Sequence, residues 1–447
     1  MKMNLAPILG RFKTNFIALA NAGLAFVNSI LYIRAFGVSI TSDSLYYSSA
    51  IIAAFSLLPG FLTEQFLQYF NDYKHRDPDK AGIFLAFNLV IVGAFGLILV
   101  GCFRLGLRGL IAFMYPTLGA AYHAKIGAFL GIMEFELFLV GFKGLFQSLL
   151  VSYGRIKAFY AGTILNSSLI LAGQLLIIAG VFRPESYPRF FIAGSASLAL
   201  FMAMVNRRIL VDAAGKARFI DWNFVKTQGP YFRNSFLMRL GHNLQGFFLP
   251  LVTSAFWSHF EGNMATCYNY ASKFYAAIQS VIIGPSQLET QYVISNGVSR
   301  REYDRIPATI RDYLRTYLPI MLAASLATLA VIAPVIHLIN RGIGPANIGT
   351  IRVCFLFLSL WLAVQCAEGP FVITIVAKNR GMVFVVANAI NISIIAAAVF
   401  LFGRFFYSIL IANILAQAAS MSIYCLRTAE ILRTARQSPA RPASDRS

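Results

Sequence analysis

Charged residues are scarce in this sequence, and acidic ones most of all. Charged residues make up 13% of the 447 positions and hydrophobic ones 58%, with 18 Asp and Glu against 38 Lys and Arg. Soluble domains are about a quarter charged, so this composition excludes a soluble globular protein. Mean hydropathy is +0.66. At about 20 apolar residues per crossing, the chain has room for on the order of a dozen membrane-spanning helices.

The sequence also lacks the spacing patterns of metal, disulfide and nucleotide sites. Its five cysteines and five histidines are scattered without pair or ligand spacing, and neither HExxH nor GxxxxGK[ST] occurs. We therefore expect no metal and no cofactor other than a coupling ion, H+ or Na+. The cysteines are expected to pack as apolar residues. The first residues show no short apolar core followed by a cleavage site, so the first span is expected to be retained.

Apolar runs, separated by polar or Pro/Gly-rich clusters, predict an all-α polytopic membrane protein with twelve transmembrane helices. The predicted spans are 12–37, 43–70, 81–105, 126–151, 158–182, 189–210, 231–255, 263–292, 313–340, 350–377, 379–402 and 404–428. The segments on one side of the membrane carry 25 Lys and Arg, and those on the other side carry 8. This bias predicts that both termini are cytoplasmic. The formal net charge of +20 is therefore mainly a signal of topology, and we expect no nucleic-acid partner.

The two halves of the chain resemble each other at a constant displacement of 225 residues. The matching pairs include Glu64 and Glu289, Gly144 and Gly369, and Asn166 and Asn391. Because six spans per half is an even number, both halves have the same orientation. They are predicted to form two parallel six-helix repeats around a central cavity that opens alternately to each side. The predicted division is 1–210 for an N-terminal lobe, 211–230 for a cytoplasmic linker, 231–428 for a C-terminal lobe and 429–447 for a basic, disordered cytoplasmic tail.

Apart from charges at the span ends that are assigned to the loops, ten charged residues fall inside the predicted spans, where a charge at mid-bilayer costs at least ~2.5 kcal/mol on insertion scales. They are Arg34, Lys143, Arg233, Arg239, Lys273, Glu64, Glu134, Glu136, Glu289 and Glu368. Such residues usually face a protein interior or a watery cavity. Arg34 and Arg233 lie near span ends, where snorkelling to the interface is the alternative. Lys273 lies close to mid-membrane, which favours a cavity role.

The embedded acids have competing interpretations. Glu136 and Lys143 are two turns apart on one helix face, and Glu134 points away from them. One interpretation of Glu136 and Lys143 is a buried ion pair that fixes helix packing. The repeat instead makes Lys143 and Glu368 equivalent, which favours a pairing across the interface in one conformational state. Glu64 and Glu289 are also equivalent.

Glu64 and Glu289 lie in the inner third of their spans. They are interpreted either as solvated at the inner interface or as a proton- or cation-coupled gate, because buried carboxylates titrate with their environment. Asp43 follows the short loop GVSITS and precedes LYYSS. A role as the N-cap of the second helix would alone explain it.

Two stretches resemble a known family. RAFGVSITSDSLYYSSAIIAAFSLLPGFLTEQFLQYF resembles the opening two helices of the multidrug/oligosaccharidyl-lipid/polysaccharide exporter (MOP) superfamily, most closely its lipid II flippase (MurJ/MviN-like) and polysaccharide flippase (Wzx-like) branches. The matching residues are Arg34 with Gly37, Asp43 with Tyr46 and Tyr47, and Glu64. YNYASKFYAAIQSVIIGP resembles the eighth-helix pattern, in which a Tyr-Ala pair, here Tyr270 and Ala271, precedes a cationic cavity residue, here Lys273.

The chain also departs from the lipid II flippases. Those usually carry two further C-terminal spans, an EGA pattern where this chain reads TEQF, and an Arg where it has Lys273. A lysine provides a point charge without the bidentate fork of an arginine. The twelve predicted spans instead resemble the polysaccharide flippases, which favours a polyprenyl-diphosphate-linked oligosaccharide as the substrate.

The resemblance implies a flippase that moves a polyprenyl-diphosphate-linked saccharide, a cell-wall or polysaccharide precursor, from the cytoplasmic to the outer leaflet of a bacterial inner membrane. Arg34, Arg239 and Lys273 would hold the diphosphate by charge-assisted bonds, with Asp43 in the same site. Glu64, Glu289, Lys143 and Glu368 are the candidates for coupling or gating. Tyr46, Tyr47, Tyr268 and Tyr270 either stack on sugars or pack against one another. We expect a monomer in contact with membrane lipids, and no enzyme.

Two other functions remain open. A drug/cation antiporter of the same superfamily would use unpaired cavity carboxylates, and the embedded acids keep it in consideration. A membrane-embedded glycosyltransferase or polymerase would need a carboxylate or His at the aqueous boundary, often on a large outer loop. The longest predicted outer connection, 106–125, contains no acid, which disfavours the enzyme.

Overall fold

The computed structural model describes residues 16–437 apart from positions 64, 261, 262, 300, 301, 341, 379 and 404, and within these residues the chain is helical with no strand. The N half comprises α2 (Phe16–Phe36), α3 (Ile40–Phe55), α4 (Gly60–Thr63), α5 (Phe66–Arg76), α6 (Pro78–Met114), α7 (Ala120–Met133), α8 (Phe135–Ser152), α9 (Ile156–Ile178), η1 (Pro184–Ser186) and α10 (Tyr187–Val205). The connecting segment comprises α11 (Arg207–Lys216), η2 (Ala217–Phe219) and α12 (Trp222–Thr227). The C half comprises α13 (Gly229–Trp257), α14 (Met264–Ile278), the π-helical turn η3 (Gln279–Ile283), α15 (Gly284–Ser299), η4 (Tyr303–Arg305), α16 (Ile306–Ile339), α17 (Pro345–Ala377), α18 (Gly381–Phe402) and α19 (Ser408–Gln437).

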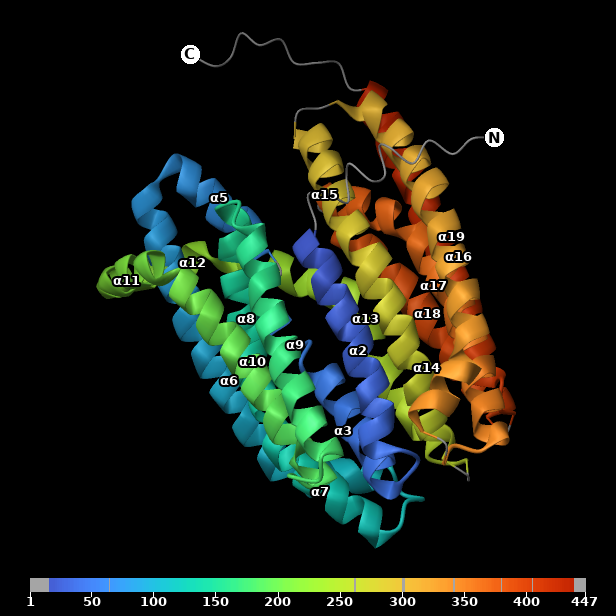
Figure 1. Ribbon diagram of the computed structural model, residues 1–447. Coiled ribbons are helices and arrows are strands. Elements are labelled where there is room, and N and C mark those ends of the chain that lie inside the picture. Colours follow the sequence, from blue (N-terminus) through green and yellow to red (C-terminus); the bar gives the residue numbers. More distant parts are fainter. Residues whose placement is uncertain are drawn as a thin grey trace.

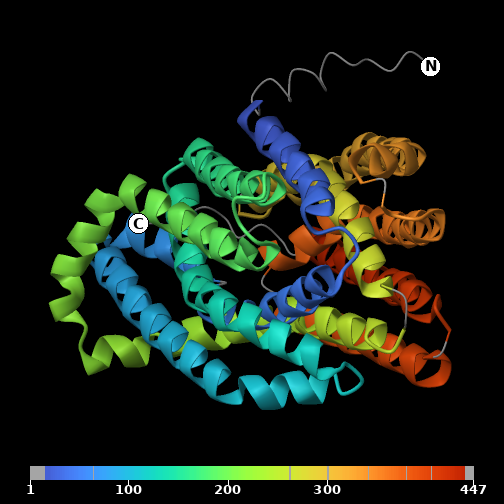
Figure 2. The same ribbon diagram turned by 60° about the horizontal axis from the view of Figure 1, so that its bottom comes forward.

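These helices form twelve spanning segments, as the sequence predicted. The helices α3 to α5 follow one another as one segment, as do α7 and α8, and α14 to α15. Eight helices of the described residues are by themselves long and apolar enough to cross a membrane. Figures 1 and 2 show the N half (blue to green) beside the C half (yellow to red) in one bundle. The chain is therefore a multi-pass membrane protein of the predicted all-α class.

The two sides of the bundle are distinguished by the chain ends. The start of α2 and the end of α19 point to the same side in Figure 1, which we call the terminal side. The turns between α2 and α3, and between α13 and α14, lie on the opposite side, which we call the far side. Within the N half, α9 packs against α2 and α10, and α8 packs against α6 and α10. Within the C half, α17 packs against α14, α16 and α19, and α18 packs against α13 and α19.

Small residues allow close helix packing in the N half, as expected where lipid supplies no hydrophobic drive between helices. A Cβ added at Gly194 of α10 would lie 2.4 Å from Oδ1 of Asn166 on α9. A Cβ added at Gly173 of α9 would lie 2.3 Å from the ring of Phe190 on α10. These two glycines therefore set the distance between α9 and α10.

Three boundaries differ from the predicted ones. The helix α6 continues to Met114, beyond the predicted end at 105, so Arg108 also lies on the helix. The predicted disordered tail from 429 is helical as far as Gln437, because AEILRTARQ is rich in helix-forming residues and Arg427 pairs with Glu430 one turn later at 2.6 Å. The connecting segment at 211–230 contains two short helices.

Candidate functional site

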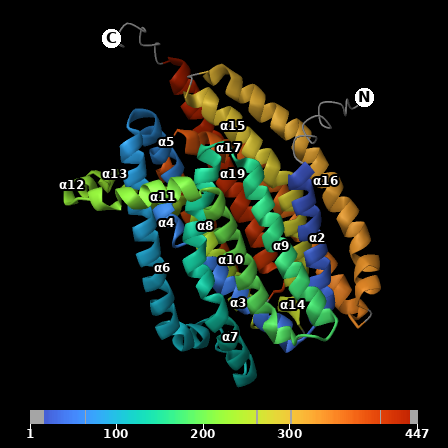
Figure 3. The same cartoon turned by 60° about the vertical axis from the view of Figure 1, so that its left-hand side comes forward.

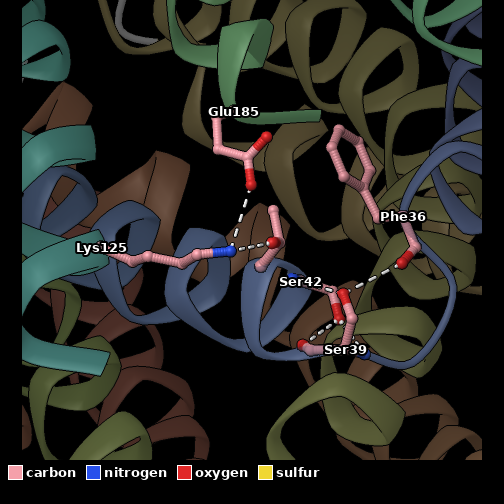
Figure 4. Close-up of polar contacts among 6 residues, drawn as sticks. Phe36, Ser39, Ser42, Lys125 and Glu185 are labelled. Carbon is pink, nitrogen blue, oxygen red and sulfur yellow. Dashed lines mark hydrogen bonds and ion pairs between the residues drawn. The ribbon is translucent and has the colours of Figure 1, made fainter. Parts of the chain in front are cut away.

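The turn between α2 and α3 places a polar group at the far side. Gly37, with φ of 54°, ends α2 in the left-handed region that glycine tolerates, and its N–H bonds to the carbonyl of Ile33 at 3.1 Å. Ser39 then caps α3 together with Ser42 in a capping box. Figure 4 shows Ser39 between Ser42 and the carbonyl of Phe36, to which its hydroxyl donates at 3.1 Å.

The alternative interpretation of Asp43 as the N-cap of the second helix is therefore wrong. Ser39 lies earlier in the same loop and supplies the cap, so α3 begins at Ile40 and Asp43 falls inside its first turn. Asp43 is 5% exposed and accepts hydrogen bonds from Thr266 of α14 and, at 3.4 Å, from Tyr122 of α7. Its carboxylate thus joins the two halves of the chain.

Further polar contacts join the halves at the far side. Ser42 and Thr266 share a hydrogen bond of 3.0 Å, and Tyr115 and Ser254 share one of 2.9 Å. The hydroxyl of Tyr270 donates to the carbonyl of Gly37. We call the set Gly37, Ser42, Asp43, Tyr115, Ser254, Thr266 and Tyr270 the far-side seal. All seven lie in or next to the interface between α2, α3, the start of α7 and the facing helices α13 and α14.

A loop contact supports the N-half part of this seal. The ammonium of Lys125 on α7 donates to Thr41 at 2.6 Å and pairs with Glu185 of η1 at 3.1 Å. Figure 4 shows Lys125 reaching from α7 toward Glu185, beside the start of α3. The first turn of α3 is thus fixed from α7 as well as from α14.

Lys273, the predicted cavity cation, lies at the contact between the halves. Its ammonium is 4.7 Å from the centre of the Tyr32 ring on α2, a cation–π contact. Tyr32 is buried and makes edge-to-face contacts with Tyr187 at 5.5 Å and Tyr270 at 6.3 Å. No acidic residue among those described forms an ion pair with Lys273. Among the described residues, the contact found for its charge is this aromatic face.

The tyrosines of the predicted sugar-stacking set are packed in this structure. Tyr46, Tyr47, Tyr268 and Tyr270 are all buried. Tyr46 of α3 and Tyr268 of α14 meet edge to face at 6.1 Å across the two halves. Their rings therefore extend the far-side seal toward the middle of the bundle.

The other predicted substrate and gating residues are placed as follows. Arg34 lies near the far-side end of α2 and is exposed, and Arg233 near the start of α13 is exposed too. Both positions are compatible with snorkelling. Arg239, Glu64 and Glu289 lie outside the residues whose side chains are described.

Glu136 and Lys143 form the buried ion pair that was one of the two interpretations. Both lie on α8, and the Lys143 ammonium also donates to the Ser195 hydroxyl of α10 at 2.9 Å. Glu134, which points away as predicted, is fully buried and pairs with Arg104 of α6 at 3.0 Å. These charges link three helices inside the N half.

Glu368 occupies the equivalent place in the C half but has a different partner. Gln417 of α19 donates its amide N–H to the Glu368 carboxylate and accepts from the Trp361 indole at 3.1 Å. Lys143 and Glu368 thus each have a partner within their own half, and the structure does not bring them together. The sequence analysis missed Gln417 and Thr266. An isolated amide or hydroxyl within an apolar span is the signal that points to such residues.

A second layer of contacts lies toward the terminal side, at the start of α13. Tyr231 is fully buried and donates to Oδ1 of Asn88 on α6 at 2.8 Å and to the carbonyl of Leu62 on α4. Asn234 donates to the Tyr69 hydroxyl at 3.0 Å. The first turns of α13 therefore attach the C half to α4, α5 and α6.

Comparisons with known proteins agree on the fold. No protein-family model matches the sequence, and a search of curated proteins gave no match. Among solved structures, an inward-facing multidrug resistance MATE family transporter of the MOP superfamily matches with a TM-score of 0.73 and 13% identity, covering 94% of this chain and 96% of that one. The lipid II flippase MurJ in an inward closed conformation matches with a TM-score of 0.66 and 13% identity, covering 94% and 90%.

A third structure, a MOP superfamily transporter from Pyrococcus furiosus Vc1, matches with a TM-score of 0.67 and 12% identity and covers 94% of both chains. The binding pocket of that transporter has reverse polarity. All three likenesses extend over nearly the whole chain. This protein therefore has the fold of the MOP superfamily, as the two sequence stretches predicted.

Proposed function

We propose that the protein is a transporter that moves a polyprenyl-diphosphate-linked saccharide between the leaflets of a bacterial inner membrane by alternating access. The head group enters between the halves from the terminal side, which the Lys/Arg bias predicts to be cytoplasmic. The polyprenyl tail stays in the lipid. The solved structures with the same fold include both a lipid II flippase and drug transporters, so the fold is compatible with this cargo and does not select it.

The observation that carries the proposal is the place of Lys273. It lies on α14 where that helix faces α2, so its charge is at the boundary that must open for a cargo to pass. Within the described part of the chain the ammonium contacts the face of Tyr32, and it keeps its capacity to donate to an anion, because a cation–π contact uses none of its three N–H groups in a conventional hydrogen bond. A diphosphate would supply the oxygens that this cation lacks.

The partners of the embedded acids, among the described residues, also support an anionic cargo. Glu134 and Glu136 each have a basic partner, and Asp43 and Glu368 accept hydrogen bonds from Thr266 and Gln417. A cationic cargo would have to displace these partners. An anionic cargo needs only to approach Lys273.

The far-side seal supports a direction for the cycle. The seal closes the interface between α3 and α14 by hydrogen bonds and buried tyrosines. We infer that this conformation receives cargo from the terminal side. Release on the other side would require these bonds to break while the contacts of α13 with α4, α5 and α6, which are already formed in this structure, hold the halves together at the terminal side.

The proposal is tested by reconstituting the full chain in liposomes that contain a labelled polyprenyl-diphosphate saccharide. Lys273→Met is expected to reduce the translocation rate at least about tenfold, since a hydrogen bond to a charged group contributes ~1.5–3 kcal/mol. Lys273→Arg should retain a substantial part of the rate. Lys80→Met, which changes an exposed lysine at the start of α6, is the matched control and should translocate normally. Normal translocation by Lys273→Met would overturn the proposal.

A second candidate, a drug/cation antiporter, is favoured by Glu368. Its carboxylate has an amide partner and no basic partner among the described residues, and MATE transporters share the fold. The two candidates separate in cells that produce the protein. Resistance to lipophilic cations that is lost in Glu368→Gln would support the antiporter, whereas unchanged sensitivity together with Lys273-dependent saccharide translocation would support the flippase.

A further inference from the structure

The segment that connects the two halves has features that the transport proposal does not use. After Asn206 the chain leaves the direction of α10, and α11 crosses the bundle at the terminal side of the N half (Figures 1 and 3). Asn206 is fully buried and donates to the carbonyl of Phe146 at 3.3 Å. The turn from a spanning helix into a transverse one is therefore fixed by a buried hydrogen bond.

One face of α11 is attached to α6. Lys216 pairs with Asp79 of α6 at 3.1 Å and with Asp212 of α11 at 3.0 Å. The Lys216 side chain lies directly over Gly82 of α6, where an added Cβ would come within 2.5 Å of its Cδ. Ala213 is fully buried on the same face. The orientation of α11 relative to the membrane helices is thus determined.

The connecting segment also carries large apolar side chains that the described residues leave exposed, one each on α11, η2 and α12. Val211 is 72% exposed, Phe219 53% and Trp222 69%. These residues lie outside the spanning segments and among charged neighbours, so contact with the acyl core of the bilayer does not explain why apolar side chains are exposed here. Large exposed apolar side chains at a membrane boundary are typical of helices that lie in the interface.

Cations accompany each of the two aromatic residues. The Arg218 guanidinium is 4.8 Å from the Phe219 ring centre, and the Lys226 ammonium is 5.8 Å from the Trp222 ring centre. At a membrane surface, aromatic rings are favoured at the depth of the lipid carbonyls and cations at the depth of the phosphates. An aromatic ring with a cation beside it therefore suits this interface.

Further cations extend this surface to the end of α8 and the start of α9. Arg155 donates to the carbonyl of Val205 at 3.0 Å, which places it beside Arg207 and Arg208. Arg155, Lys157, Arg207, Arg208, Arg218 and Lys226 are all exposed, and none of them has an acidic partner among the described residues. The nearby acids are engaged, because Asp212 pairs with Lys216 and Asp221 caps α12 by accepting from the N–H of Phe224 at 2.6 Å.

We propose that this linker surface, formed by Val211, Phe219 and Trp222 with the six cations named above, docks on the headgroups of anionic glycerophospholipids in the leaflet at the terminal side. The occupant is chosen by charge complementarity, since six exposed cations of this surface have no acidic partner among the described residues and its apolar side chains follow a spanning helix in the chain. Because the linker joins the halves, bound lipid would set the position from which they move relative to each other.

Tryptophan fluorescence provides the test, because the chain contains three tryptophans. Trp257 is fully buried and Trp361 is partly buried, so Trp222 is the one exposed at the linker. The difference between the spectra of the wild type and Trp222→Phe isolates the signal of Trp222 and leaves Trp257 and Trp361 unchanged. The full-length protein is placed in bilayers of equal composition in which either phosphatidylglycerol or phosphatidylcholine carries brominated acyl chains.

We expect brominated phosphatidylglycerol to quench Trp222 at least about twofold more than brominated phosphatidylcholine, and added salt to reduce the difference. Arg207→Gln/Arg208→Gln/Arg218→Gln should remove the preference. Arg305→Gln/Arg311→Gln/Arg315→Gln, which makes the same change in net charge on the C half, should leave it intact. Equal quenching by both lipids, or quenching by neither, would overturn the proposal. So would a preference that appears only with a polyprenyl diphosphate, because that result would assign the surface to the cargo.

Discussion

Ser42 of α3 and Thr266 of α14 are 224 positions apart in sequence and share a hydrogen bond of 3.0 Å at the far side of the bundle. The same threonine donates to Asp43, so a single side chain of the C half holds two consecutive residues of the N half. Neither helix can leave the other without breaking both contacts. If transport requires this interface to open, a covalent link at these two positions should stop it.

The first prediction is therefore that Ser42→Cys/Thr266→Cys, made in a variant whose five native cysteines are replaced, loses transport on oxidation and regains it on reduction. The side chains already touch, so a disulfide should form under mild oxidant. Ser44→Cys/Thr266→Cys is the control, since Ser44 lies on a different face of α3. Saccharide translocation in liposomes is the measurement. Full transport by the oxidised Ser42 and Thr266 pair would show that this interface does not open.

A second prediction concerns the packing of α9 on α10. Gly194→Ala should destabilise the protein by about 1–3 kcal/mol, because the new methyl group would lie 2.4 Å from Oδ1 and 3.1 Å from the carbonyl oxygen of Asn166. Gly131→Ala, on a helix surface with no atom within 4 Å of the added Cβ, should be neutral or stabilising by up to about 1 kcal/mol. Thermal unfolding in detergent compares the two. A Gly194→Ala variant as stable as Gly131→Ala would contradict the close approach.

The sequence predicted the spans well because an apolar run of the required length is a local property. The Glu136 and Lys143 pair could be predicted for the same reason, because a spacing of seven residues on one helix places both side chains on the same face. Contacts between segments that are distant in the sequence could not be predicted. The role of Asp43 depends on Thr266, and nothing in the loop GVSITS indicates a partner 223 residues away.

Capping also misled the sequence analysis. Ser39, Ser42 and Asp43 are all favoured N-cap residues within one short stretch. The choice among them depends on where α2 ends, and Gly37 fixes that point with its positive φ. The pairing partner of Glu368 was beyond prediction as well, because Gln417 is a neutral residue inside an apolar helix and carries no charge pattern.

A third prediction concerns Lys216, which fastens α11 to α6. Hydrogen bonds from its ammonium to Asp212 and to Asp79 raise the pKa of Lys216 above its ordinary value. A raised lysine pKa means that the attachment is fully present below the unfolded value of about 10.4 and is lost as pH rises through the higher, folded value. Fluorescence anisotropy of Trp222 should therefore stay high from pH 6 to pH 10 and decrease above that range.

Lys216→Met should show the low anisotropy already at pH 7, because α11 is no longer tied to Asp79. Lys80→Met is the control. Lys80 lies next to Asp79 in the first turn of α6, but it pairs with Asp77 at 3.1 Å and not with α11. An anisotropy in Lys216→Met equal to that of the wild type would show that other contacts, such as the burial of Ala213, suffice to hold the linker.

The last prediction separates the structural role of the Glu136 and Lys143 pair from a role in coupling. Lys143→Met leaves a carboxylate buried in α8 without a cation, and breaking such a pair typically costs about 3–5 kcal/mol. Removing both charges in Glu136→Leu/Lys143→Met should restore most of this stability, since no isolated charge remains. Thermal unfolding of the three proteins measures the first effect. If the pair only fixes helix packing, the double variant should also transport at close to the wild-type rate, because α8 and α10 stay together. A double variant that is stable yet inactive would instead show that the ion pair must break and re-form during transport, which is the coupling role that the sequence repeat suggested for Lys143.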